Sequence, residues 1–227
     1  MTASGSGARS HLVPGASDAL LVIDVQTDFT PGGRLPVPDG DAVVPLVNRV
    51  ASAFANVLLT QDWHPPGHIS FASAHPAHAP LDTIGVAYGR QVLWPDHCVQ
   101  GTAGAEFAPG LAIPHATLLL RKGYDRDVDS YSAFNAADGR PTGLAAYLRA
   151  RRIARVFLAG LATDFCVRFS AIDARNAGFD AVMVEDACRG IDTNGSLAAA
   201  WEAMARAGVQ RIQSSELAAP AARGISR

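Results

Sequence analysis

The sequence predicts an α/β fold, namely a three-layer, doubly wound domain with a mostly parallel sheet of about six strands. Short, nearly continuous apolar runs alternate with segments of helical periodicity along the chain. Runs that are apolar on both faces are typical of parallel strands covered by helices on each side. The chain has 227 residues, of which 48% are hydrophobic and 18% charged, so it is long enough to bury one full core.

Six segments have the length and the β-branched or leucine-rich composition of buried strands. These segments are residues 19–25, 56–61, 117–121, 155–159, 181–185 and 209–213.

Helical periodicity fills the intervals between these strands. Val43, Val47 and Val50 recur at helical spacing; Asp41 is placed to cap this first helix, and Pro45 is tolerated in its first turn. Glycines stand where two later helices are expected to end. The later helices are expected at residues 142–151, 164–176 and 196–207, with Gly178 and Gly208 at the ends of the last two.

The segment 62–116 does not follow this alternation of strands and helices. It is irregular and contains seven prolines and six of the seven histidines of the chain. A long stretch without regular structure inside a compact domain is typical of a functional segment. Its aromatic residues, Trp63, Phe71, Trp94 and Phe107, favour a packed segment over a disordered one.

The sequence predicts a single domain, residues 18–215, with flexible tails at 1–17 and 216–227. The first tail lacks the continuous apolar region of a secretion signal, and the three cysteines are odd in number, which favours a reducing cytoplasm. A net charge of −2 gives no electrostatic reason to expect nucleic acid or an anionic membrane as partner. The alanine-rich composition is compatible with a homo-oligomer.

Polar side chains directly follow four of the predicted strands. Asp24 follows the first strand, Asp62 and His64 the second, Lys122 the third and Cys166 the fourth. Ligands of an open parallel sheet bind outside the carboxyl ends of its strands, so these side chains are expected to converge. Each residue alone also fits a structural role, and a cysteine after a strand is more often a small buried hydrophobe.

Aspartate, lysine and cysteine together form a set suited to attack on a carbonyl. Asp24 can take the thiol proton, Cys166 can attack, and Lys122 can stabilise the negative charge of both. The start of a helix at Cys166 offers free N–H groups and partial positive charge. A Ser-His-Asp triad is not supported, because no G-x-S-x-G pattern is present.

A second group consists of one carboxylate and several imidazoles. Asp62, His64 and His97, with His68 at that site or just outside it, suit a divalent ion of the Zn, Mn or Fe type and leave open positions for water or substrate. The remaining histidines and cysteines are assigned structural or exposed positions. His75, His78 and His115 are expected to be exposed in loops, and Cys98 and Cys188 to be buried.

These residues stand in motifs that resemble the nicotinamidases, within the isochorismatase-like cysteine hydrolases. The resemblance runs from about residue 19 to residue 213, with the motifs in the family's order. The motifs are Asp24-Val25-Gln26-x-Asp28-Phe29, Asp62-Trp63-His64-Pro65, His68-Ile69-Ser70-Phe71, Trp94-Pro95-x-His97-Cys98, Lys122-Gly123, Tyr131-Ser132-x-Phe134 and Gly160-x-Ala162-Thr163-Asp164-x-Cys166.

The resemblance implies a role for each matching residue. Cys166 is implied to be the nucleophile, Asp24 the proton shuttle and Lys122 their cationic partner. The backbone N–H groups of Ala162 and Cys166 are implied to form an oxyanion hole, with a cis bond before Ala162. Asp62, His64 and His97 are implied to hold the metal, zinc being favoured over manganese and iron, and Phe29, Trp94 and Tyr131 to wall the substrate ring.

The activity implied is hydrolysis of nicotinamide to nicotinate and ammonia through a Cys166 thioester, in NAD salvage, with pyrazinamide-like analogues as further substrates. Two features depart from the common pattern. The charged segment 123–130 is a candidate for a mobile lid, and Phe165, beside the nucleophile, offers no side-chain hydrogen bond.

Three alternatives stay open at this stage. A ureido or carbamoyl amidohydrolase of the same superfamily would keep Asp24, Lys122 and Cys166 without needing the metal group. An isochorismatase proper cleaves a vinyl ether and does not require the cysteine. A non-catalytic metal-binding scaffold would leave Cys166 without a reaction to perform.

Overall fold

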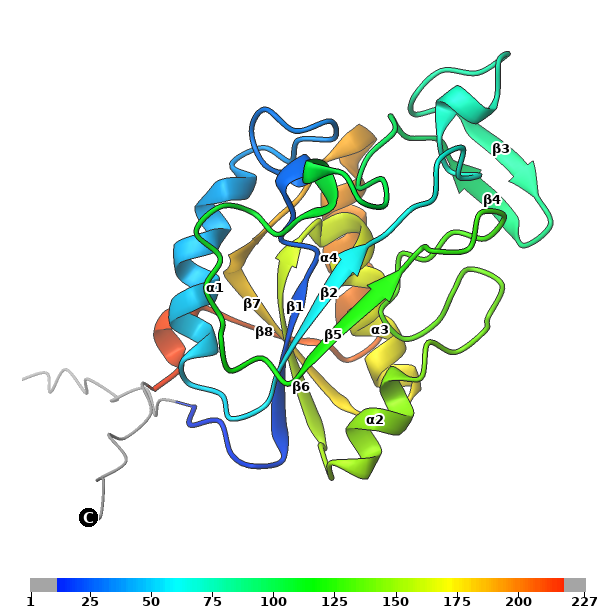
Figure 1. The fold of residues 1–227 in the computed structure, drawn as a ribbon. Helices are drawn as coiled ribbons and strands as arrows, with labels where there is room; N and C mark the ends of the chain where they lie inside the picture. The colour runs from blue at the N-terminus through cyan, green and yellow to red at the C-terminus, as the bar shows by residue number, and fades with distance from the viewer. Residues whose placement is uncertain (1–11, 219–227) are drawn as a thin grey trace, which may run out of the picture.

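The computed structural model describes residues 12–218 and centres on a six-stranded sheet (Figure 1). The strand order is β5-β2-β1-β6-β7-β8, and every neighbouring pair in it is parallel. The predicted α/β class and its six strands are confirmed. The strands are β1 (Asp18–Ile23), β2 (Val57–Asp62), β5 (Leu118–Lys122), β6 (Arg155–Leu161), β7 (Asp180–Arg189) and β8 (Gln210–Ile212).

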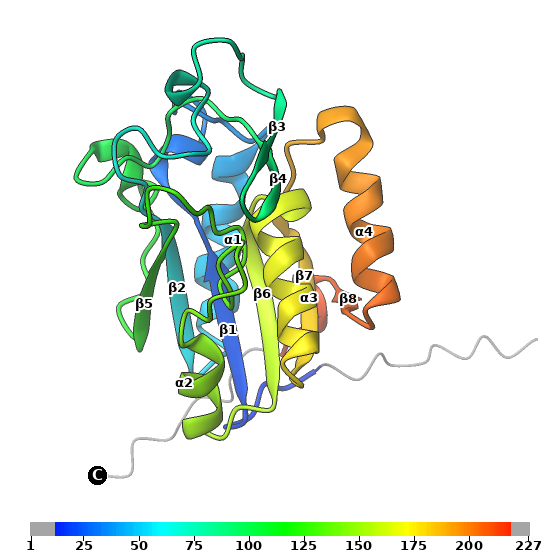
Figure 2. The same ribbon diagram turned by 90° about the vertical axis from the view of Figure 1, so that its right-hand side faces the viewer.

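Helices cover both faces of the sheet and make three layers (Figure 2). The helix α1 (Val43–Ala51) lies on one face, and α2 (Leu144–Ala150), α3 (Arg168–Asn176) and α4 (Ser196–Arg206) lie on the other. Strand β1 contributes side chains to the hydrophobic cores on both faces of the sheet, because successive side chains of a strand point to opposite faces. Leu20 and Val22 pack in the core that includes α1, whereas Leu21 and Ile23 pack in the core of the other three helices.

One predicted helix cap was wrong, and one predicted helix has a first turn of a different form. Asp41 does not cap α1: it lies within a preceding 3-10 turn, Gly40–Ala42, and makes no side-chain capping bond. The helix predicted at 164–176 is divided into a π-helical turn, Thr163–Val167, and α3. The N–H of Val167 donates across five residues to the carbonyl of Ala162 (3.2 Å), and such π turns are frequent at functional sites.

The predicted helix ends are confirmed at two glycines. Gly178 and Gly208 follow α3 and α4 with φ values of 89° and 77°, in the left-handed region that glycine adopts without steric cost.

The segment 62–116 is largely irregular, as predicted, but it also contains an antiparallel hairpin that the sequence analysis missed. Its strands are β3 (Thr83–Val86) and β4 (Gly89–Val92), drawn at the upper right of Figure 1. Both strands are four residues long and mostly exposed, so they lack the apolar run by which buried strands are recognised.

The predicted domain limits and tails stay a prediction, and residues 1–11 and 219–227 lie outside the described part of the chain. Near both ends of the described chain, Leu12 forms a bridge to Leu217. Within residues 12–218, every helix is too short or too polar to cross a bilayer.

Gly160 allows β6 to lie close against β1 directly before the loop that carries Cys166. Its φ is 122°, and a Cβ at this position would lie 2.1 Å from the carbonyl oxygen of Ile23. Real Cβ atoms do not approach backbone so closely, so a side chain here would force the two central strands apart.

We expect Gly160→Ala to lower the free energy of unfolding by about 3 kcal/mol or more, since the backbone of β1 cannot move away without disturbing the core. Urea denaturation followed by circular dichroism measures this change. Gly85→Ala in β3 is the matched control, because its Cβ would meet no atom within 4 Å. Equal unfolding midpoints for the two variants would contradict the prediction.

Candidate active site and metal centre

The carboxyl ends of the central strands bring four of the predicted site residues together. Asp62 and Lys122 are the last residues of β2 and β5 and are paired in register. Asp24 directly follows β1, and its φ of 47° lies outside the extended region, so the strand ends before it. Cys166 lies in the π-helical turn that follows β6. All four side chains are buried.

Lys122 is the centre of this group. Its Nζ lies 2.9 Å from Oδ2 of Asp24, donates to Oδ1 of Asp62, and lies 3.3 Å from Sγ of Cys166. It also donates to the carbonyl of Ser130 at 3.0 Å. One ammonium therefore touches both carboxylates and the thiol.

Burial and charge set the protonation states of these groups. Burial would lower the pKa of Lys122, but Asp24 and Asp62 outweigh it and raise that pKa well above its usual range. Burial raises the pKa of Asp24, and Lys122 opposes this change. Burial also raises the pKa of the Cys166 thiol well above its usual range, again against the opposing effect of Lys122. The resting thiol is therefore protonated and needs a base to become a nucleophile.

Thr60 orients Asp24, a role that the sequence analysis missed. The Thr60 hydroxyl donates to Oδ1 of Asp24 at 2.5 Å and accepts from the Asp24 N–H at 3.1 Å. Oδ2 accepts no hydrogen bond from the described residues and faces Lys122. The signal available in the sequence was a hydroxyl within the apolar strand β2. Thr60 follows Leu59, whose register partner in β1 is Val22, so Thr60 lies beside the end of β1.

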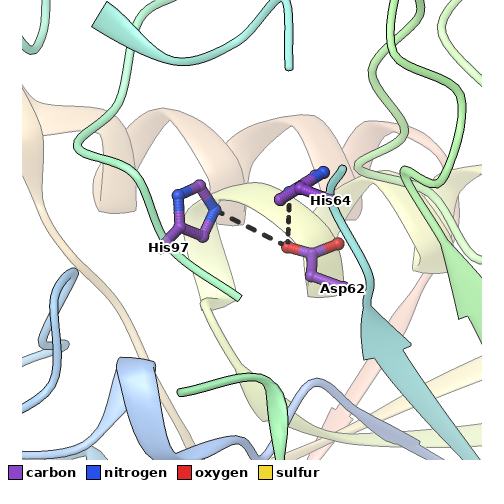
Figure 3. Close-up of side chains that lie close together, drawn as sticks. All are labelled: Asp62, His64 and His97. Atoms are coloured by element: carbon purple, nitrogen blue, oxygen red, sulfur yellow. Dashed lines mark ion pairs between the residues drawn. The ribbon is translucent and has the colours of Figure 1, made fainter. Parts of the chain in front are cut away.

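Asp62, His64 and His97 form one group whose ligand atoms lie within 4.8 Å of one another (Figure 3). Oδ2 of Asp62 lies 3.6 Å from Nε2 of His64 and 3.9 Å from Nε2 of His97. The other oxygen of the same carboxylate contacts Lys122. Asp62 therefore links the imidazole group to the group around Cys166.

The two imidazoles present the donor atoms that a metal requires. Nδ1 of His64 bonds the carbonyl of Gly123 and Nδ1 of His97 bonds the carbonyl of Pro95, each at 2.8 Å. A carbonyl only accepts, so Nδ1 carries a proton, and Nε2 has a lone pair to offer when the ring is neutral. Burial lowers the pKa of His97 to about 4, which keeps it neutral. The donor set fits a divalent metal ion.

His68 lies beside this group. Its ring centroid is 4.2 Å from that of His64, and Nδ1 bonds the hydroxyl of Ser70 at 2.8 Å. Its Nε2 is buried and has no hydrogen-bond partner among the described residues. His68 belongs to a second possible ligand group, with His64 and the buried Asp129. Its predicted role as a ligand of the first group stays a prediction.

The remaining predicted histidines and cysteines are placed as follows. His78 and His115 are exposed, as predicted, but His75 is half-buried and its Nε2 bonds the carbonyl of Ile69 at 2.8 Å. Cys98 and Cys188 are buried free thiols, as predicted.

Gln26 fixes the backbone of Asp62, a second role that the sequence analysis missed. Its Nε2 donates to the carbonyls of Asp62 and Ala105, both at 2.9 Å, and its Oε1 accepts from the N–H of Asp62 at 2.8 Å. A buried glutamine thus joins the end of β2 to the irregular segment that follows it.

A cavity opens beside Cys166. Phe29, Trp94 and Tyr131, which were predicted to wall a substrate ring, all line it, and Tyr131 accepts a hydrogen bond from Trp94 Nε1 at 2.9 Å. Three apolar lining residues, Leu35, Phe165 and Ile191, were not among the predicted site residues. The complete lining is Phe29, Leu35, Asp62, Trp94, His97, Tyr131, Ala162, Phe165, Cys166 and Ile191.

The loop before Cys166 has the backbone form that the resemblance implied, since the bond between Leu161 and Ala162 is cis. Cys166 is the fourth residue of the π-helical turn, so its N–H belongs to the first turn, where N–H groups are available to a ligand.

The predicted lid segment 123–130 is tied to its neighbours in this structure. The carbonyl of Arg126 accepts from the N–H of Ile69 at 2.9 Å, and Asp125 pairs with Arg140 at 2.6 Å. Asp129, at its end, accepts from Nε2 of Gln91 in β4 at 2.8 Å.

Fold and site together define a three-layer α/β enzyme domain whose strand ends hold a cysteine, an aspartate and a lysine beside a possible metal centre. The Isochorismatase domain matches residues 18–216, and the chain therefore belongs to the isochorismatase family.

Among characterised relatives, the nicotinamidase of Acinetobacter baylyi is 54% identical over 197 residues, which cover 86% of this chain and 92% of the relative. The solved structure of an Acinetobacter baumanii nicotinamidase and pyrazinamidase has a TM-score of 0.88 at 54% identity and covers 89% of this chain and 98% of its own. The pyrazinamidase of Pyrococcus horikoshii, solved in complex with zinc, has a TM-score of 0.73 at 36% identity and covers 87% and 99%. The resemblance inferred from the motifs is confirmed.

We expect His97→Ala to weaken binding of a divalent ion at least about tenfold, because it removes one of the three donors that converge at this site. Titration of metal-stripped protein with zinc, followed by calorimetry, measures the affinity. His78→Ala is the matched control, because His78 is exposed and pairs only with Asp82. An unchanged affinity in the His97 variant would show that the ion binds elsewhere.

Proposed function

We propose that this chain is a metal-dependent nicotinamidase that hydrolyses nicotinamide to nicotinate and ammonia, a reaction of NAD salvage. The observation that carries the proposal is the contact of Lys122 with Asp24 and with Cys166, which lines a cavity together with Asp62 and His97. The nicotinamidase activity of the similar Acinetobacter baylyi protein supports the choice of substrate.

The first step is formation of the thiolate at Cys166. Its proton passes to Asp24, whose carboxylate oxygen lies within 4.8 Å of Sγ and whose raised pKa makes it a stronger base than an exposed aspartate. Lys122 stays protonated and stabilises the thiolate. Sulfur then attacks the carboxamide carbon of the substrate.

The tetrahedral intermediate places its oxyanion near the N–H groups of Ala162 and Cys166. Asp24 gives the proton to the amide nitrogen, and the C–N bond breaks. Ammonia departs, and the acyl group remains bound to Cys166 as a thioester. Asp24 then takes a proton from water, the resulting hydroxide attacks the thioester, and the thiol leaves with that proton. The acid is released and the resting state is restored.

Asp62, His64 and His97 would hold the metal through Oδ2 and the two Nε2 atoms, and zinc is the proposed ion. When bound, a divalent metal supplies a Lewis acid with open positions for the ring nitrogen of the substrate or for water. The chain itself orients the ring between the aromatic walls of the cavity, which lowers the entropic part of the barrier.

The same walls support activity on pyrazinamide-like analogues, because the side chains of Phe29 and Phe165 offer no hydrogen bond by which one ring would be preferred to another. The three free thiols support a cytoplasmic location. A homo-oligomer is compatible with Leu119, which is 45% exposed on the edge strand β5.

A carbamoyl amidohydrolase of the same superfamily is the competing function, and the metal group argues against it. We expect ammonia release from nicotinamide to stop after chelation and to return when zinc, manganese or iron is restored. Cys166→Ala is expected to lower turnover at least about 10³-fold, since the nucleophile is lost. Cys188→Ala, which removes a buried thiol away from the cavity, is the matched control. Full activity after complete metal removal would favour the carbamoyl hydrolase.

Thr60→Val is expected to change the pH dependence of the reaction. The Thr60 hydrogen bond lowers the pKa of Asp24, so its loss raises that pKa further. Asp24 must be deprotonated to accept the thiol proton. On acidification, the variant should therefore lose activity at a higher pH than wild type does.

The rate at optimal pH should also fall about tenfold, since Asp24 loses an orienting bond. Profiles of kcat/KM against pH measure both effects. Thr60→Ser restores the hydroxyl and should restore the wild-type profile. An acidic limb that stays in place, or moves to lower pH, would show that Asp24 is not the base.

A further inference from the structure

The turn that carries the nucleophile is joined to a distant segment of the chain by one buried carboxylate. Asp164, two residues before Cys166, is 1% exposed. Its Oδ1 accepts from the N–H of Ile191 at 3.0 Å, and its Oδ2 accepts from the N–H of Asp192 at 2.9 Å and from the hydroxyl of Ser196 at 2.5 Å. One side chain thus binds three donors between the end of β7 and the start of α4.

The segment held in this way forms part of the substrate cavity. Ile191 lines the cavity together with Phe29, Trp94 and Tyr131 from earlier parts of the chain. The backbone after it is irregular: Asp192, Asn194 and Gly195 have φ values of 56°, 53° and 78°. No strand ladder fixes Ile191 or Asp192, so the carboxylate supplies bonds that regular structure would otherwise supply.

The segment at Gly190 passes close to the turn that carries Asp164. A Cβ at Gly190 would lie 3.2 Å from Oδ1 of Asp164 and 2.8 Å from Cδ1 of Leu197. A Cβ at position 190 would therefore press on Asp164 and on the end of the Leu197 side chain, directly before Ile191.

We propose that Asp164 is a positioning residue that fixes Ile191 relative to Cys166 and thereby sets which ring substituents the cavity accepts. The inference rests on the proposed nicotinamidase function. Asp164 sits in the same turn as Phe165 and Cys166, so it holds the nucleophile and the Ile191 wall in one geometry. Hydrolysis needs the carboxamide carbon close to Sγ, and the wall decides how the ring lies when that distance is reached.

The chemistry of the bonds requires a carboxylate. All three partners donate, two of them through backbone N–H groups that cannot reverse their role. In Asp164→Asn the side-chain amide would present its own N–H groups to at least one of these donors. Ser196→Ala removes a single bond and leaves the two backbone bonds in place, so it tests the same contact without burying an unpaired donor beside Ile191.

The test compares kcat and KM for nicotinamide and for methyl-substituted nicotinamides in wild type, Asp164→Asn, Ser196→Ala and Gly190→Ala. We expect Asp164→Asn to raise KM for nicotinamide about tenfold with a smaller change in kcat, and to reduce discrimination against methylated rings by a similar factor. Ser196→Ala should shift discrimination in the same direction by a smaller factor. Gly190→Ala, which displaces the loop from the other side, should also shift it.

Asp18→Asn is the matched control for general loss of stability. Asp18 is also buried, at 4% exposed, and accepts three hydrogen bonds, from Gly15 and Arg155, but it is the first residue of β1 and lies at the end of that strand away from Asp24. It should lower the melting temperature without changing discrimination. If wild type is active but discrimination against methylated rings is unchanged in Asp164→Asn and Ser196→Ala, the inference about Asp164 is overturned and the proposed function is not. Wild type that releases no ammonia from nicotinamide would overturn the proposed function, and the role of Asp164 with it.

Discussion

The buried contact of Lys122 with two carboxylates is the constraint on which the site depends. An ammonium without exposure to water is stable only when its charge is compensated at short range, and Asp24 and Asp62 supply that compensation from neighbouring strands. The register of β2 against β5 pairs Asp62 with Lys122, and the register of β1 against β2 brings Asp24 beside them. A shift of one residue in either strand would bury these charges unpaired.

The same contact explains why a base and a thiol can lie together in their resting forms. Burial favours the neutral form of Cys166, while the ammonium keeps Asp24 available as an anion despite its raised pKa. Lys122 touches both partners, so moving the proton from sulfur to oxygen leaves the total charge beside the ammonium unchanged. A proton transfer between two groups that share one cation needs little rearrangement of the surroundings.

The sequence predicted the strands, and with them the residues at the strand ends, because apolar runs and the polar residues that end them are local signals. Thr60 and Gln26 escaped prediction, since their roles depend on which strand lies next to which. The hairpin β3–β4 was missed because it is short and exposed. Ile191 lies 25 residues after Cys166 and lines the cavity, and its N–H donates to Asp164, a contact that no spacing reveals.

Asp62 makes the metal group and the cysteine group one electrostatic unit. One of its oxygens pairs with Lys122 and the other faces the Nε2 atoms of His64 and His97. With Asp24 and Asp62 ionised and Lys122 protonated, these three residues carry one net negative charge in a buried setting. A divalent cation held there would compensate that charge and would draw electron density from the carboxylate that contacts Lys122. The ammonium would then interact more strongly with Asp24 and the thiolate, so a bound metal would favour the ionised nucleophile as well as the orientation of the ring.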